Sequence, residues 1–300
     1  MSGWPERPAP EGLTPEQVLA LEFKQLGRRD FDTLMDWTDR EGWNPGRHDR
    51  EAFWNQDPHG YRGLHMDGAL IAGGSIVSYD GAFGFMGFFI VRPELRGFGI
   101  GRHLWTQRRD TLLKRLDSGA AIGMDGVVDM QPFYGKGGFT KQFADVRHVR
   151  RGERVELHPE VAVGPGDLLD LNAYDKSCFL FARPRFLASW TNQPEVRVFR
   201  FIRAGRIQGW AALRTAAQGR RIGPLFADSA EVAEALYNAC LDAATGEEVY
   251  IDVPMCNGEA VALVNRKGAE PVFECARMVH GHAPPWPLER MYGITSFELG

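Results

Sequence analysis

The sequence has no long apolar run, no paired-cysteine motif and no excess of basic residues. No apolar stretch approaches the ~20 residues of a membrane span, and the start of the chain is rich in proline and contains acids, unlike a secretory signal. The four cysteines all lie in the second half without a CxxC pair, which favours buried free thiols. A net charge of −4 at pH 7 lacks the basic footprint of a nucleic-acid-binding protein. We therefore expect a soluble, cytoplasmic protein with neither a membrane nor a nucleic acid as partner.

Metal-ligand spacing is also missing, because His48, His59, His65 and His103 form no ligand pattern, and we expect no metal cofactor. The composition that remains, with 44% hydrophobic and 25% charged residues, is that of a globular protein able to bury a core. A length of 300 residues fits one large domain or two of roughly 150 residues each.

The expected elements follow the same order in the two halves: two helices, a hairpin, a helix, a strand, a helix and a strand. Apolar spacing and turn residues predict the first set at Asp30–Arg40, Asp49–Asn55, Gly68–Tyr79, Phe83–Val91, a helix containing Leu104 to Leu116, Ala120–Met124, Pro132–Lys136 and Phe143–Val149. They predict the second set at Asp167–Asp175, Arg183–Trp190, Val196–Ile202, Ile207–Arg214, Arg221–Pro224, Ser229–Ala244, Glu248–Val253, Glu259–Arg266 and Val272–Val279. Asp80-Gly81 between two apolar runs is a strong hairpin signal, and the run Phe83–Val91, apolar on both faces, should be a central strand. The order predicts a tandem duplication of one α/β (α+β) unit, each unit a mixed central sheet flanked by helices.

The Pro/Gly-rich segment Val155–Gly166 marks the boundary between the two units. We expect a flexible N-terminal tail at residues 1–16, a first domain at residues 17–154 and a second at residues 163–300. The basic run Arg147–Arg154 before the boundary is typical of a solvated edge strand.

One glycine-rich turn carries the main chemical signal. The segment from Val91 to Arg102 reads VRPELRGFGIGR and places three alternate glycines between an apolar strand and a helix. Glycines allow positive φ and close approach of a ligand, and N–H groups at a helix N-terminus bind anions. With Arg96 and Arg102 adding positive charge, the turn predicts a pyrophosphate site. Its spacing does not fit the GxGxxG dinucleotide fingerprint, so a nucleotide-binding module is disfavoured.

The same segment resembles the acetyl-CoA-binding motif of the GNAT superfamily of acyl-CoA N-acyltransferases. The resemblance implies two tandem GNAT-like domains, acetyl-CoA as co-substrate and direct attack of an amine on the thioester in a ternary complex. It implies that the co-substrate is held by Ile90, Val91, Arg96, Gly97, Phe98, Gly99, Ile100, Gly101 and Arg102. Backbone N–H groups near Ile90 and Val91 would polarise the thioester carbonyl.

A second part of the resemblance lies downstream, where the segment from Pro132 to Phe139 reads PFYGKGGF and is similar to the family segment ending in Tyr-x-Lys-x-Gly-Phe. The family tyrosine lies near the CoA sulfur and protonates the leaving thiolate. Carried over, that catalytic residue is Tyr134, and a phenol with a reference pKa of ~10 can supply the proton.

Two departures from the family pattern concern the first half. Val127 stands where many members carry an asparagine seven residues before the tyrosine, and the stretch Phe83–Gly87 lacks the carboxylate that often serves as general base. Asp125, Glu94, His65 or a chain of water molecules remain open as the base. A catalytically weak acyl-CoA-binding sensor therefore remains an alternative to an enzyme.

The second half resembles the superfamily again through the pattern Asn-x-x-Ala-x-x-Leu that ends at Leu263, but Val264 follows where a tyrosine would stand. The segment Gly223–Asp228 keeps one glycine and ends in a carboxylate, which would repel a pyrophosphate and cap the helix instead. We expect this unit to have lost its co-substrate site.

The loop Asp39–Asp49 borders the acceptor pocket in the GNAT fold, so Trp43 and Asn44 are candidates for substrate contact, together with Asp125. Trp37 and Trp54 lie in the same region, and aromatic faces can hold a cationic amine. A closely linked second domain should narrow the cleft. We expect a small-molecule amine as acceptor, and a lysine in a protein or peptide is the alternative.

Overall fold

The computed structural model describes residue 4 and residues 12–300. Most of the tail predicted for residues 1–16 lies outside the described residues. Its last residues belong to a short helix, α1 (Pro15–Leu19). The helix begins there because Thr14 and Gln17 form a reciprocal capping box.

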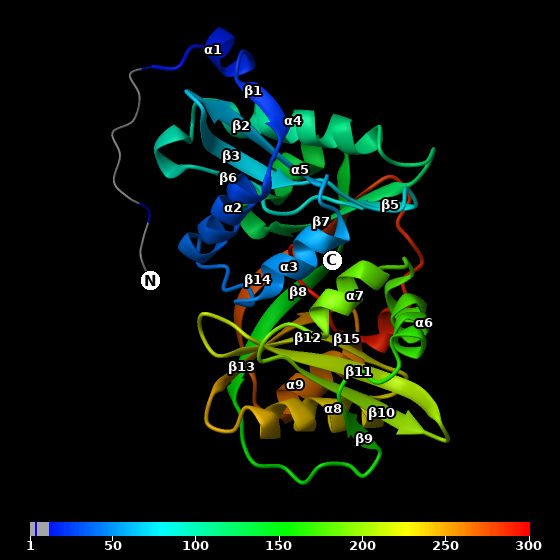
Figure 1. The fold of residues 1–300 in the computed structure, drawn as a ribbon. Helices are drawn as coiled ribbons and strands as arrows, with labels where there is room; N and C mark the ends of the chain where they lie inside the picture. The colour runs from blue at the N-terminus through cyan, green and yellow to red at the C-terminus, as the bar shows by residue number, and fades with distance from the viewer. Residues whose placement is uncertain (1–3, 5–11) are drawn as a thin grey trace.

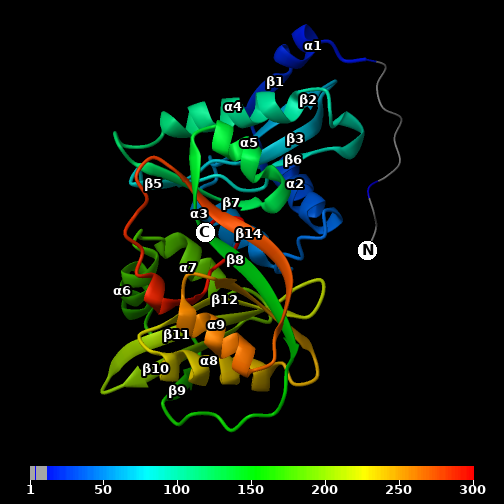
Figure 2. The same cartoon turned by 180° about the vertical axis from the view of Figure 1, so that it is seen from behind.

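A small antiparallel sheet has the strand order β1-β2-β3-β6. Its strands are β1 (Glu22–Gln25), β2 (Tyr61–Met66), β3 (Ala69–Ser75) and β6 (Ile90–Val91). Helices α2 (Arg28–Arg40) and α4 (Ile100–Leu113) cover its two faces (Figures 1 and 2). The sequence did not predict β1 and β2, which are short and interrupted by polar residues.

The second sheet runs through both halves of the chain in the order β4-β5-β7-β14-β8-β13-β12-β11-β10-β9, and β15 pairs with β12. The strands from the first half are β4 (Val77–Tyr79), β5 (Phe83–Phe85), β7 (Ala121–Val127) and β8 (Phe139–Arg151). Those that follow are β9 (Val161–Val163), β10 (Arg197–Arg203), β11 (Arg206–Thr215), β12 (Arg220–Ala227), β13 (Glu248–Pro254), β14 (Glu270–His280) and β15 (Met291–Gly293).

The two halves share this sheet by exchanging long strands. Strand β14 of the second half lies between β7 and β8, and β8 of the first half lies between β14 and β13. The two strands cross the middle of the molecule side by side in Figures 1 and 2. The prediction of a solvated edge strand at Arg147–Arg154 is therefore wrong: β8 is central up to Arg151, and Arg147 is only 5% exposed.

The remaining helices surround the second sheet and the junction. They are α3 (Asp49–Gln56), α5 (Gln131–Lys136), α6 (Leu168–Phe179), α7 (Pro184–Trp190), α8 (Ala230–Ala243) and α9 (Gly258–Arg266), with short 3-10 turns η1 (Pro93–Leu95), η2 (Val128–Met130) and η3 (Leu288–Arg290). Among the described residues, no helix combines the length and the apolar character needed to cross a membrane.

Each of the two long strands predicted on either side of the hairpin is interrupted, and its two parts belong to different sheets. The hairpin itself is confirmed, since Tyr79 pairs with Phe83 around Asp80-Gly81. However, the run Gly68–Tyr79 divides after Ser75, and the run Phe83–Val91 divides after Phe85. At this division Arg108 Nη2 of α4 donates hydrogen bonds to the carbonyl oxygens of Ser75 and Gly87, so a guanidinium fills the gap that opens between the two sheets.

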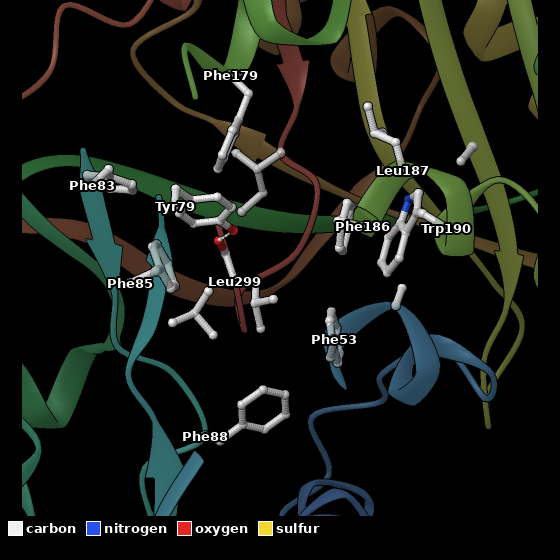
Figure 3. Packing of buried hydrophobic residues seen from close by; sticks show 14 of the residues in the cluster. Phe53, Tyr79, Phe83, Phe85, Phe88, Phe179, Phe186, Leu187, Trp190 and Leu299 are labelled. Carbon is white, nitrogen blue, oxygen red and sulfur yellow. Dashed lines mark hydrogen bonds between the residues drawn. The ribbon is translucent and has the colours of Figure 1, made fainter. Parts of the chain in front are cut away.

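An apolar core joins the halves beside this gap. Figure 3 shows Phe53 of α3 facing Phe186 and Trp190 of α7, while Tyr79 of β4 lies next to Phe179 of α6. All of these side chains are buried. Burial of large aromatic side chains on both sides indicates that the two halves form one folded body.

Candidate active site

A cavity of about 460 Å³ opens where the two sheets part. Eight of the residues predicted for the site line it: Trp43, Ile90, Val91, Arg96, Gly97, Gly101, Asp125 and Tyr134. The other wall comes from the second half, through Phe273 and Cys275 of β14 and Phe297 and Glu298 of the C-terminal segment. No motif in the sequence predicted a role for these four residues in the site.

The glycine turn at the start of α4 lines the cavity through Gly97 and Gly101. Gly97 and Gly99 have φ of 87° and 85°, values that favour glycine, and a Cβ at either position would meet nothing within 4 Å. The helix has neither a side-chain cap nor an acid in its first turn. Arg96 and Arg102 are both exposed. Open space over uncapped N–H groups with two cations nearby fits a pyrophosphate.

The other residues predicted for the turn lie behind this surface. Ile100 is fully buried in a cluster with Leu104 and Leu95, so it anchors α4 to the small sheet. Phe98 packs at the edge of the same cluster. Phe98, Gly99, Ile100 and Arg102 do not line the cavity. Their roles in holding a ligand stay predictions, through backbone N–H groups in the case of Phe98 and Ile100.

Tyr134 of α5 lines the cavity and packs against β7. Its ring approaches β7 so closely that a Cβ on Gly126 would lie 2.9 Å from Tyr134 Cδ2. Burial raises the pKa of the phenol, and the charge of Arg108 acts in the opposite direction. Burial lowers the pKa of Arg108 to about 9, so its guanidinium remains charged at neutral pH. The phenol therefore keeps its proton at neutral pH and has a cation near it.

Of the residues left open as general base, the structure brings only Asp125 to the cavity. Its carboxylate forms a buried two-pronged ion pair with Arg277 of β14, at 2.7 and 3.1 Å. Glu94 instead pairs with Arg92, and His65 contacts Asp30 at 3.0 Å, both away from this cavity. Burial raises the pKa of Asp125, and Arg277 opposes that shift.

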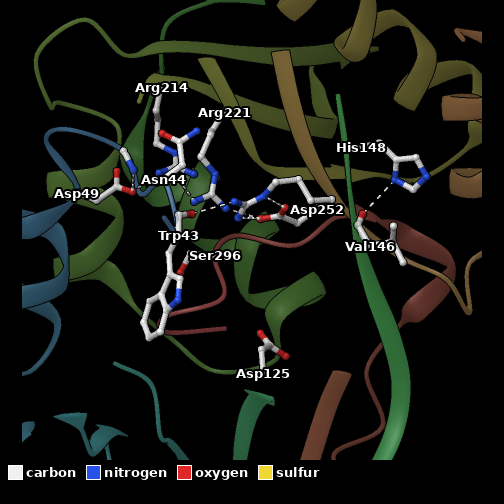
Figure 4. Close-up of polar contacts among 12 residues, drawn as sticks. Trp43, Asn44, Asp49, Asp125, Val146, His148, Arg214, Arg221, Asp252 and Ser296 are labelled. Carbon is white, nitrogen blue, oxygen red and sulfur yellow. Dashed lines mark hydrogen bonds and ion pairs between the residues drawn. The ribbon is translucent and has the colours of Figure 1, made fainter. Parts of the chain in front are cut away.

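The loop that carries Trp43 and Asn44 is held by the second half of the chain. Arg147 Nη1 donates to the carbonyl of Trp43 at 2.8 Å, and Arg221 Nη1 donates to the carbonyl of Asn44 at 3.0 Å. Both guanidinium groups also bind Asp252 (Figure 4). The indole of Trp43 extends away from this network toward the side on which Asp125 lies.

The structure separates the other candidates in this region from the cavity. The side chain of Asn44 forms two hydrogen bonds with the backbone of residue 218, at 2.9 and 3.0 Å. Trp37 is buried beside Trp4, and Trp54 stacks on Tyr61 with ring centroids 5.8 Å apart. Of the three tryptophans predicted to border the pocket, Trp43 alone lines the cavity.

The equivalent turn of the second half is filled by its own side chains. Ser229 caps α8 by accepting a hydrogen bond from Val232 N. Asp228, directly before it, pairs with Arg290 at 2.7 Å and accepts a hydrogen bond from the Tyr174 hydroxyl at 2.9 Å. This helix start therefore presents a carboxylate and a satisfied cap where α4 presents open N–H groups.

One acyl-CoA molecule per chain is the expected binding stoichiometry. The glycine turn before α4 can accept a pyrophosphate, whereas Asp228 before α8 repels one. Calorimetric titration with CoA measures the number of sites. Two sites of similar affinity would contradict this assignment.

Two family models match the chain, one in each half. The model described as "Acetyltransferase (GNAT) family" matches residues 28–139, and the model described as "Acetyltransferase (GNAT) domain" matches residues 171–293. The chain belongs to the GNAT superfamily and carries two GNAT domains in tandem. This confirms the resemblance and the fold class predicted from the glycine turn and the order of elements.

Three similar proteins align with most of the chain, across both GNAT domains. The holothin acyltransferase of Pseudoalteromonas sp. (strain SANK 73390) is 25% identical in an alignment of 286 residues that covers 92% of this chain and 94% of that protein. A Pyrococcus horikoshii protein provisionally assigned as an acetyltransferase superposes with a TM-score of 0.80 at 20% identity, over 97% of this chain and 98% of that one. A tandem GNAT protein from the clavulanic acid biosynthesis pathway gives a TM-score of 0.60 at 14% identity, over 88% and 99%. At these identities the solved structures support the fold alone.

Among the residues that the structure describes, no cluster of three or more His, Cys, Asp or Glu side chains has an arrangement that could hold a metal ion.

Proposed function

We propose that this GNAT protein transfers an acetyl group from acetyl-CoA to the amine of a small molecule. The observation that carries the proposal is the cavity itself. Its lining includes Gly97 and Gly101 of the glycine turn, Val91 of β6 and Tyr134, which are the parts that a pyrophosphate, a thioester and a leaving thiolate need. A member of the GNAT superfamily is expected to bind acyl-CoA at such a turn.

Each part of this wall has a chemical role in the proposal. N–H groups of the turn and the cations of Arg96 and Arg102 hold the pyrophosphate. Backbone N–H groups near Ile90 and Val91 polarise the acyl carbonyl. The phenol of Tyr134, which keeps its proton at neutral pH, donates that proton to the departing sulfur.

The aromatic and acidic part of the cavity, to which both halves contribute, favours a small acceptor. Phe273, Phe297 and Trp43 supply three aromatic side chains, and Asp125 and Glu298 supply carboxylates. Aromatic faces and carboxylates together suit a cationic amine with an apolar body. The relative named for acyl transfer to holothin supports a small-molecule acceptor as well.

The test is a screen of acceptors with acetyl-CoA, in which CoA release and product mass are measured together. The panel contains holothin, polyamines, amino acids, aminosugars and lysine peptides, and the enzyme-free reaction is the control. We expect acetylation of at least one small amine above background. Acetylation of long peptides or folded proteins alone would contradict the small acceptor, and CoA binding without transfer to any amine would favour a sensor.

A further inference from the structure

Three carboxylates line the cavity, and two of them are already engaged. Glu41 accepts hydrogen bonds from Arg96 and from Trp4 Nε1. Asp125 binds Arg277 through both oxygens. The third carboxylate is that of Glu298, which is only 3% exposed. Its Oε2 is buried and has no hydrogen-bond partner among the residues that the structure describes.

Glu298 reaches the cavity from the last residues of the chain. Its carbonyl oxygen lies so close to Gly87 that a Cβ added to Gly87 would be only 2.1 Å from this oxygen. The neighbouring residues fix this segment, since Leu299 accepts a hydrogen bond from the Tyr79 hydroxyl at 2.6 Å and Thr295 accepts one from Arg183 at 3.0 Å. The segment is thus held against the stretch Phe83–Gly87, which has no ionisable side chain of its own.

The surroundings of Glu298 contain both signs of charge. Burial raises its pKa, the nearby carboxylates of Asp49 and Asp252 raise it further, and the guanidinium groups of Arg221 and Arg147 lower it. Both guanidinium groups already bind Asp252, and Asp49 is paired with Arg214. Glu298 therefore lies near cations without forming an ion pair with one of them. A carboxylate with a raised pKa accepts a proton more readily than an exposed glutamate.

We propose that Glu298 is the general base of the reaction, supplied to the first GNAT domain by the C-terminal segment of the second. This inference rests on the proposed function. The carboxylate of Glu298 takes one proton from the acceptor ammonium and leaves a neutral amine. The amine nitrogen bonds the acyl carbon as the bond from that carbon to sulfur breaks, and Tyr134 donates its proton to the sulfur. The acylated nitrogen then gives a second proton to the Tyr134 phenolate. Glu298 releases its proton to solvent, so each group regains its starting state.

The variant Glu298→Gln keeps the shape of the side chain and removes the base. With the best acceptor of the screen, we expect kcat to fall on the order of 10²-fold at pH 7. The affinity for CoA, measured by calorimetry, should stay unchanged. The loss should shrink as the pH rises toward the pKa of the acceptor, because free amine then forms in solution without the enzyme. Glu289→Gln replaces an exposed glutamate outside the cavity and is the matched control.

The folded state gives a second readout that needs no substrate. Because the folded-state pKa of Glu298 is raised, ionisation of this buried carboxyl costs stability as the pH rises through that pKa. Glu298→Gln should therefore match the wild-type melting temperature in acid and exceed it at alkaline pH. A difference in melting temperature that does not change with pH would contradict the buried, titrating carboxyl.

Chemical rescue distinguishes a loss of activity caused by removal of the base from one caused by disruption of the fold. Glu298→Ala leaves space in the cavity, and formate should restore part of its activity while leaving the wild type unaffected. If the wild type acetylates amines and Glu298→Gln stays within about twofold of it at every pH, the role of Glu298 is wrong and the proposed function stands. If the wild type acetylates no amine, the proposed function itself fails.

Discussion

Tyr134→Phe should lower kcat on the order of 10²-fold, the usual size of the effect when a general acid is removed. The variant keeps the ring that packs against Gly126 and removes the hydroxyl alone. Burial raises the pKa of this phenol, so the group is protonated across the neutral range, and the charge of Arg108, which opposes that rise, favours donation of the proton to the sulfur. The KM for the amine should change less than kcat. Steady-state kinetics at saturating acetyl-CoA measure both constants.

Tyr237→Phe is the matched control for this experiment. Tyr237 is a buried tyrosine of α8 in the core of the second half, and burial raises its pKa as well. Loss of its hydroxyl should leave kcat unchanged. A Tyr134→Phe enzyme within about twofold of the wild type, under conditions in which chemistry limits the rate, would reject the role of Tyr134.

Gly99→Asp and Gly101→Asp should each abolish binding of CoA. Both substitutions place a carboxylate at the N-terminus of α4, where the pyrophosphate is expected, and like charges repel there. Gly101 lines the cavity and lies inside the helix, so its substitution strains the backbone little. Gly99 has φ of 85°, so its substitution also strains the turn.

A substitution elsewhere in the same domain is the matched control for the backbone strain that Gly99→Asp introduces. Gly119 has φ of 84°, and a Cβ there would also meet nothing within 4 Å, but Gly119 lies in the turn before β7, whereas Gly99 lies directly before α4. Gly119→Asp should reproduce the cost in stability without the loss of CoA affinity. Calorimetry on the folded variants decides, and unchanged affinity in both turn variants would overturn the assignment of the site.

Much of the donor side of this site could be predicted from the sequence because its signals are local. The turn from Arg96 to Gly101 and the segment around Tyr134 are short motifs, and each takes its conformation from neighbours a few residues away. The duplicated order of elements likewise predicted two α/β units. The structure places Arg96, Gly97, Gly101 and Tyr134 along one cavity.

On the acceptor side, Trp43 and Asp125 were predicted, but the rest could not be, because it depends on contacts between residues far apart in the chain. The exchange of β8 and β14 makes the strand that carries Arg147 central, where Asp252 pairs with Arg147, whereas the local density of charge predicts exposure. Glu298 lies more than 200 residues from Gly87, and no motif surrounds it. The interruption after Phe85 was missed for a similar reason: the apolar run Phe83–Val91 is continuous in sequence, while the guanidinium that fills the gap comes from Arg108 on another element.

The structure of a complex with CoA and an unreactive amine would test the proposed site most directly. We expect the pyrophosphate on the N–H groups of residues 97–101, the sulfur within hydrogen-bonding distance of the Tyr134 hydroxyl and the amine between Trp43 and Glu298. Binding of the CoA at the start of α8, or a sulfur remote from Tyr134, would contradict it.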